Sequence, residues 1–182
     1  ALGIPSVRDE RTNIIFTGRI APNKKQEDII AAFAAYKRHY DANARLILVG
    51  SYDAMPRYYE QLLQYIEQLE VQDVIFTGHI PFDEILAYYH VADAFVCMSE
   101  HEGFCIPLIE AMSCRIPVVA YSATAVPDTM GDAGILLETK DAKYACDKID
   151  KLFKDEQYRS TIIDGQMKHV DEFIKDDYEK KL

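Results

Sequence analysis

Six short apolar runs, separated by longer segments of helical periodicity, constrain the fold of this chain most strongly. The runs are "NIIFTG" (13–18), "RLILVG" (45–50), "DVIFTG" (73–78), "AFVCMS" (94–99), "PVVAYS" (117–122) and "AGILLE" (133–138). Continuous apolar runs of this length are typical of strands that are buried on both faces of a parallel sheet. Because parallel strands need a crossover between them, the alternation predicts an α/β domain.

The segments between and after these runs predict the covering helices. Their ranges are 25–40, 56–70, 81–92, 107–113, 141–155 and 156–174, and in the second of them Tyr59, Leu62, Leu63 and Ile66 form the expected apolar side. The layout predicts a Rossmann-like, doubly wound parallel sheet of about six strands with helices on both faces. No linker rich in Pro, Gly or Ser divides residues 1–182, so we expect one domain, with a polar, frayed tail over about 175–182.

The composition limits the class of ligand and the compartment. A formal net charge of −10 argues against non-specific nucleic-acid binding, although a small anionic ligand responds only to local charge. The four cysteines Cys97, Cys105, Cys114 and Cys146 form no C-x-x-C pair and predict free thiols in a reducing compartment. No apolar run approaches membrane-spanning length and no signal peptide is visible, so we expect a cytoplasmic protein.

The common phosphate-binding and metal-binding motifs are absent from the sequence. It contains no G-x-G-x-x-G, no G-x-x-x-x-G-K-[ST] and no D-x-D. Glu100, His101 and Glu102 suggest a metal site at first sight, but adjacent side chains on an extended loop diverge and further ligands are missing. We therefore expect no metal site and no cofactor.

Ligands of open α/β sheets bind outside the carboxyl ends of the strands, where "EHEGFCIPLIEAM" (100–112) follows the fourth run. Pro107 suits the first turn of a helix, so the preceding amides lie at a helix N-terminus and form an anion site. Those amides belong to Phe104, Cys105 and Ile106. Glu110, one turn into the helix, is a good acceptor for a ribose diol, and Glu102 is placed for the hydroxyls of a sugar. The alternative is that both carboxylates only favour the helix dipole.

A second candidate segment, "GRIAPNKK" (18–25), follows the first run. Arg19 and Lys24 are the guanidinium and the ammonium that a diphosphate favours. The alternative is a pair of solvated loop cations. Lys25 follows directly, and the sequence alone leaves open which lysine faces the ligand.

Taken together, "FTGRIAPNKK", "LILVGS", "VIFTGHIPFDEILAYYHVADAFVCMSEHEGFCIPLIEAMSCRIPVVAYS" and "VPDTMGDAGILL" carry a resemblance over about residues 5–175. They resemble the C-terminal, donor-binding domain of GT-B fold retaining glycosyltransferases of the family 4 type (glycosyl transferases group 1). The resemblance implies a nucleoside-diphosphate sugar as donor, with no metal needed to bind it. It implies hexosyl transfer in polysaccharide biosynthesis.

The resemblance also implies roles for individual residues. Arg19 and Lys24 would bind the diphosphate and assist its departure, Glu102 would meet the donor sugar, and Glu110 would hold the ribose. The remaining donor-binding positions it implies are Gly18, Gly78, His79, Ile80, Gly103, Phe104, Cys105 and Ile106, with the turn 78–80 near the base.

The sequence departs from the family pattern at several positions. Cys105 stands where the family often has glycine, and Ala123, Thr124 and Asp128 replace paired glycines and a glutamate in a loop that often contacts the donor sugar. Nothing in the chain corresponds to the N-terminal, acceptor-binding domain. We therefore expect the donor half of a longer enzyme, inactive alone, whose missing half would bind a sugar, lipid or glycan acceptor and carry any peripheral contact with the inner face of a membrane.

Three alternatives remain open at this point. They are a non-catalytic nucleotide-binding or partner-binding module, half of a GT-B nucleotide-sugar 2-epimerase, and half of a Rossmann dehydrogenase, which the missing glycine fingerprint disfavours. The sequence does not identify the nucleobase, the sugar, the acceptor or the oligomeric state.

Overall fold

A computed structural model describes residues 9–179, with side chains through residue 175. It contains one six-stranded sheet in the order β3-β2-β1-β4-β5-β6, and every pairing in it is parallel. The strands are β1 (Asn13–Thr17), β2 (Arg45–Val49), β3 (Val74–Phe76), β4 (Ala94–Cys97), β5 (Val118–Tyr121) and β6 (Ile135–Leu137). The prediction of a Rossmann-like, doubly wound parallel sheet is confirmed.

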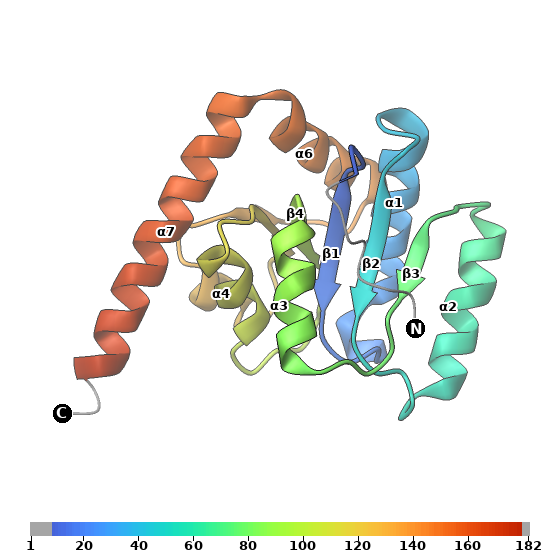
Figure 1. Ribbon diagram of the computed structural model, residues 1–182, viewed down its shortest axis with the longest axis horizontal. Helices are drawn as coiled ribbons and strands as arrows, with labels where there is room; N and C mark the ends of the chain where they lie inside the picture. Colours follow the sequence, from blue (N-terminus) through green and yellow to red (C-terminus); the bar gives the residue numbers. More distant parts are fainter. Residues whose placement is uncertain (1–8, 180–182) are drawn as a thin grey trace.

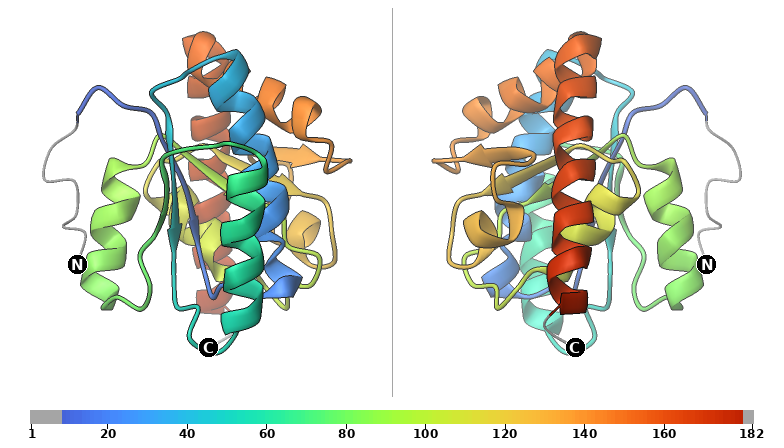
Figure 2. Two further views of the ribbon diagram at one scale, coloured as in Figure 1. Left: turned by 90° about the vertical axis from the view of Figure 1, so that its right-hand side faces the viewer. Right: turned by 90° about the vertical axis from the view of Figure 1, so that its left-hand side faces the viewer.

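Helices cover both faces of this sheet (Figures 1 and 2). They are the short 3-10 helix η1 (Pro22–Lys24) and the α-helices α1 (Gln26–His39), α2 (Pro56–Gln68), α3 (Phe82–Val91), α4 (Ile106–Ser113), α5 (Val126–Met130), α6 (Ala142–Lys154) and α7 (Glu156–Glu179). Figure 2 shows α3 on one side of the sheet and α1, α2 and α6 on the other. Helix α7 packs along α4 and α6.

The strands and helices form because their apolar residues match these layers. All residues of β1, β2 and β4 are buried, as expected for strands covered on both faces. Along α1, Ile29, Ile30, Phe33 and Tyr36 recur at helical spacing and are buried against the sheet and α6. The packing of these residues positions the loops that follow the strands.

The sheet reverses its winding direction between β1 and β4. The chain runs outward from β1 to β2 and β3, then returns to place β4 on the other side of β1. Ligands of doubly wound folds bind at this switch point, outside the carboxyl ends of the two strands. In Figure 1 it lies at the lower end of the molecule, toward which the arrows of β1 and β2 point.

The observed elements differ from the predicted ones in a few places. Helices η1 and α5 were not predicted, because such short helices show no periodicity. Leu63 was expected on the buried side of α2 but is 40% exposed, whereas Tyr58 is buried. Helix α7 extends to Glu179. Residues 1–8 and 180–182 of the expected domain and tail lie outside the described residues.

Within the described residues, no helix combines the length and the apolar character that a membrane crossing requires.

Candidate functional site

The loops that follow β1 and β4 are joined at the switch point. The backbone N–H of Glu100 donates to the carbonyl of Asn23 at 3.0 Å, and the Asn23 side-chain amide donates to the carbonyl of His101 at 3.3 Å. These bonds hold the two segments predicted to bind an anion, 18–25 and 100–112, against each other.

Lys24 and Glu102 form an ion pair across this junction. The Lys24 Nζ lies 2.6 Å from Glu102 Oε1, and the two side chains are only 18% and 8% exposed. Lys25 turns away, toward Glu100 at 3.4 Å and Glu27 at 3.7 Å. Lys24 therefore contacts Glu102, whereas Lys25 contacts Glu100 of the same loop.

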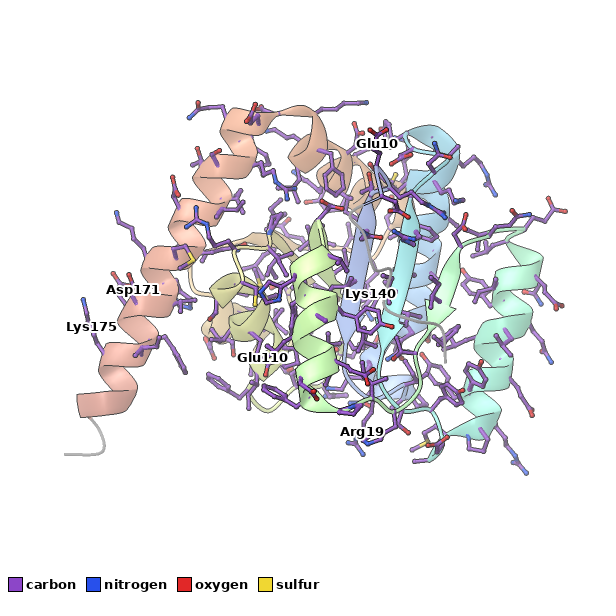
Figure 3. The ribbon with its side chains drawn as sticks, in the orientation of Figure 1. Glu10, Arg19, Glu110, Lys140, Asp171 and Lys175 are labelled. Atoms are coloured by element: carbon purple, nitrogen blue, oxygen red, sulfur yellow. The ribbon has the colours of Figure 1, made fainter. Side chains whose placement is uncertain are left out.

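Arg19 is exposed beside this pair, directly after β1. Among the described residues its guanidinium has no ion-pair partner, so it remains available to an anion. Figure 3 shows Arg19 and Glu110 toward the same lower end of the molecule. The buried side chain of Gln26 donates from Nε2 to the Arg19 carbonyl at 3.0 Å and fixes this loop. The sequence reasoning missed Gln26, because a lone polar residue in a first helical turn is usually solvated.

The N-terminus of α4 presents free amides at the switch point. The helix begins at Ile106 with Pro107 in its first turn, as predicted. In the described part of the chain, the amides of Phe104, Cys105 and Ile106 have no hydrogen-bond acceptor. Unpaired amides together with the positive end of a helix dipole favour binding of an anion.

Cys105 adopts the left-handed conformation, with φ 54° and ψ 56°, directly before α4. Glycine adopts this conformation without steric cost, which explains its frequent presence here in the related family. The Cys105 side chain is 6% exposed and turned inward, so it does not cover the amides. A hydrogen bond between the two thiols lowers the pKa of Cys97 and raises the pKa of Cys105.

Glu110 is held by a buried chain of hydroxyls. The Tyr89 hydroxyl of α3 donates to Glu110 Oε2 at 2.9 Å and lies 2.7 Å from the Thr17 hydroxyl at the end of β1. Burial raises the pKa of Tyr89, so this hydroxyl stays protonated and can donate. Glu110 is half-buried and keeps its other carboxylate oxygen for a ligand. Sequence reasoning missed Tyr89, since tyrosines in an amphipathic helix are usually counted as part of the core.

The loop over 122–130 supports the 102–105 segment. The Thr124 hydroxyl accepts from the Glu102 amide at 3.0 Å, and the Thr129 hydroxyl donates to the Phe104 carbonyl at 2.6 Å. The Phe104 ring stacks on Phe173 of α7, with centroids 5.3 Å apart. Both threonines of residues 122–130 therefore hold the 102–105 segment in place. One of them, Thr124, is a departure from the family pattern.

The turn Gly78–His79–Ile80 follows β3, two strands from β1. Gly78 has φ 71° and pairs with Gly50, His79 is exposed and Ile80 is half-buried. At the usual spacing of strands, this turn lies about 10 Å from the end of β1. Gly18 and Gly103 both lie in the joined loops, where Gly103 is exposed.

Glu100, His101 and Glu102 do not converge on a common point. Glu100 pairs with Lys140 at 2.8 Å and with Lys25, whereas Glu102 pairs with Lys24. The ion pair with Lys140 lowers the pKa of Glu100. A different group gathers instead: one ligand atom each from Cys97, Glu102 and Cys105 lie within 4.8 Å of one another.

A hollow of about 640 Å³ lies at the opposite end of the sheet, near the amino ends of β1 and β4. Thr12, Asp93 and Arg159 are among its lining residues. It is separate from the switch point, which lies at the carboxyl ends of these strands.

Comparisons with known proteins identify the family of this chain. The family model described as "Glycosyl transferases group 1" matches residues 4–169. The chain is 29% identical over 148 residues to O-antigen chain mannosyltransferase B of Escherichia coli, which covers 80% of this chain and 38% of that protein. It is 31% identical over 137 residues to N-acetyl-alpha-D-glucosaminyl L-malate synthase of Bacillus anthracis, covering 74% of this chain and 34% of that one. The chain thus spans less than half the length of these two curated relatives.

Two solved structures show the same fold. The C-terminal domain of the group 1 glycosyl transferase LpcC from Francisella tularensis has a TM-score of 0.77 and 29% identity, covering 87% of this chain and 84% of that one. HepE of Anabaena, solved in complex with UDP-glucose, has a TM-score of 0.80 and 24% identity, covering 94% of this chain and 46% of that one. With a family model that covers most of its length and a GT-B fold, the chain belongs to the glycosyl transferases group 1 family.

Proposed function

We propose that this chain is the donor-binding half of a GT-B retaining glycosyltransferase and binds a nucleoside-diphosphate sugar. The observation that carries this proposal is the meeting of Lys24, Glu102 and the free amides of α4 at the switch point of the sheet. A diphosphate between them would satisfy the amides and share the Lys24 ammonium.

The chemical difficulty of the reaction is the negative charge that grows on the departing nucleoside diphosphate. Arg19, Lys24 and the amides at the start of α4 would stabilise that charge from fixed positions. Gln26 holds the loop that carries both cations, so the site needs little rearrangement when the charge develops. The lack of a D-x-D motif supports donor binding without a metal ion.

The other proposed contacts are to the ribose, the base and the sugar of the donor. Glu110, held by Tyr89, would accept hydrogen bonds from the ribose hydroxyls, and the turn 78–80 would contact the base through its backbone. Glu102 would exchange its contact with Lys24 for the hydroxyls of the sugar. The UDP-glucose complex of HepE and the mannosyltransferase names of relatives support a hexose donor.

Binding of the donor is tested by a thermal-shift panel of UDP, GDP, ADP and their sugars. At one hundred times its dissociation constant, a ligand stabilises the folded state by about 2.7 kcal/mol, which raises the midpoint of a chain of this size by about 5–10 °C. We expect nucleotides of one base to raise the midpoint more than the others do. An unchanged midpoint with every nucleotide at millimolar concentration would contradict the proposal.

In the whole enzyme, we propose that a second α/β domain binds the acceptor and closes over this site, as implied by the share of the relatives that the chain spans. The donor half alone should then show no sugar transfer, whereas the longer protein should transfer with retention at the anomeric carbon. Anomeric analysis of the product by NMR tests the stereochemistry. We further propose a cytoplasmic location and a role in polysaccharide biosynthesis.

A further inference from the structure

Two thiols and one carboxylate converge beneath the loop between β4 and α4. Cys97 ends β4, Cys105 precedes α4, and Glu102 lies between them in the chain. Their ligand atoms all lie within 4.8 Å of one another. The cysteines are 1% and 6% exposed, and the Glu102 side chain is 8% exposed.

This set of ligand atoms suits Zn²⁺ in chemistry and in size. Zinc is bound by thiolates at about 2.3 Å and by carboxylates at about 2.1 Å, usually as a tetrahedron. Donor atoms of such a site lie about 3.6–3.8 Å apart. The spacing of the group is therefore within about 1 Å of that of a zinc site.

The left-handed backbone conformation of Cys105 is independent support for a role of its thiol. A left-handed conformation costs a residue other than glycine about 1–2 kcal/mol, so glycine would be the cheaper residue at this position. Relative to glycine, cysteine adds one methylene group and a thiol, and the thiol is directed at Cys97 rather than at solvent. Among the described residues, Cys114 and Cys146 take no part in this group.

We propose that Cys97, Glu102 and Cys105 form a binding site for one thiophilic divalent cation, with Zn²⁺ as the expected metal. On binding, the two thiols release their protons to solvent, and Glu102 exchanges the Lys24 ammonium for the metal ion. The protein supplies three ligands, and a water molecule completes the tetrahedron. This site is distinct from a metal that bridges a donor diphosphate. It shares Glu102 with the proposed donor site, but the metal binds in the absence of nucleotide.

Cobalt tests the site directly, because Co²⁺ replaces Zn²⁺ and thiolate ligands give it a strong near-ultraviolet charge-transfer band. The reduced, chelator-treated chain is titrated with Co²⁺ without nucleotide. We expect a band that saturates at one equivalent and disappears when one equivalent of Zn²⁺ is added. Cys105→Gly, which suits the backbone, should lose the band, and Cys114→Ala should keep it. Glu102→Gln should weaken binding at least tenfold while the band remains.

The absence of a band in the wild-type chain would overturn the proposal. A band of undiminished intensity and affinity in Cys105→Gly would also overturn it, as would its loss in Cys114→Ala. Circular dichroism verifies that each variant is folded, and Cys97→Ala, which leaves only a small cavity, provides a second variant lacking a ligand. Because no nucleotide is present, failure here leaves the donor proposal standing, and failure of the thermal-shift panel leaves the metal proposal standing.

Discussion

At the scale of single residues, the candidate site depends on side chains that other side chains hold in place. Glu110 is the clearest case, because its carboxylate is anchored by Tyr89 and Thr17 before any ligand binds. Lys24 is similarly held by Glu102. Preorganised groups bind a ligand without the entropic cost of ordering them.

Glu110→Gln should weaken binding of the preferred nucleoside diphosphate by about 1–3 kcal/mol, or roughly 5- to 150-fold, because the ribose loses a charged acceptor. Isothermal titration calorimetry measures the change. Tyr89→Phe removes only the anchoring hydroxyl and should have a smaller effect. Equal affinity in wild type and Glu110→Gln would exclude the ribose contact.

The sequence predicted the positions of these residues better than their directions. Since "GRIAPNKK" and "EHEGFCIPLIEAM" follow strands of one parallel sheet, their meeting at one edge followed from topology. The topology did not determine which of Lys24 and Lys25 contacts Glu102. That depends on the turn of η1 and on the left-handed backbone conformation of Lys25. Gln26 and Tyr89 escaped prediction because their polar atoms point inward from helices, and no pattern in the sequence shows that direction.

At the scale of elements, the ends of β1 and β2 are brought together by glycines. Gly50 has φ 149°, and a Cβ atom built on it would lie 2.0 Å from the Gly18 carbonyl oxygen. This close approach shapes the loop that carries Arg19. The short apolar runs made the strands predictable. Helix α5 was not predicted, because its five residues are too few to show a helical periodicity.

Gly50→Ala should therefore destabilise the fold by about 3 kcal/mol or more, through the clash and the strained backbone. Gly165→Ala is the matched control, because Gly165 lies in α7 with no atom within 4 Å of the added Cβ. That control should gain about 0.5–1 kcal/mol. Urea unfolding measures both, and a tolerated Gly50→Ala would contradict the close approach of the two backbones.

Asp73, just before β3, links α1 and the segment before β1 at the amino end of the sheet. Its carboxylate contacts Lys37 of α1 at 2.6 Å and Arg11 at 2.8 Å, and these partners, Lys37 first, lower its pKa. A carboxyl whose pKa is lower in the folded state stabilises the fold above its unfolded pKa of about 4, and this contribution is lost as the pH falls through the folded pKa.

The stability difference between wild type and Asp73→Asn should consequently be constant from about pH 5 to 8 and shrink below about pH 4. Asparagine tolerates the left-handed backbone of Asp73, so the substitution tests the charge alone. Urea unfolding across this range measures the difference. A gap that persists unchanged at pH 3 would show that the ion pairs contribute nothing.

At the scale of the whole molecule, a chain with net charge −10 exposes cations and free helix amides at one end of its sheet. The order of the strands places that end at the switch point. The alternation of apolar runs predicted the doubly wound sheet but not the order of its strands. The arrangement of the loops at that end was not predictable either, since it depends on how loops from several strands fold over one another.

The proposal that the switch point binds a nucleoside diphosphate is tested most directly by calorimetric titration of the 182-residue chain with the nucleotide that the thermal-shift panel selects. We predict one-to-one binding, a loss of affinity of at least about tenfold in Lys24→Ala, from a lost charge-assisted contact of about 1.5–3 kcal/mol, and little change in Lys25→Ala. Absence of binding, or equal affinity in wild type and Lys24→Ala, would contradict it.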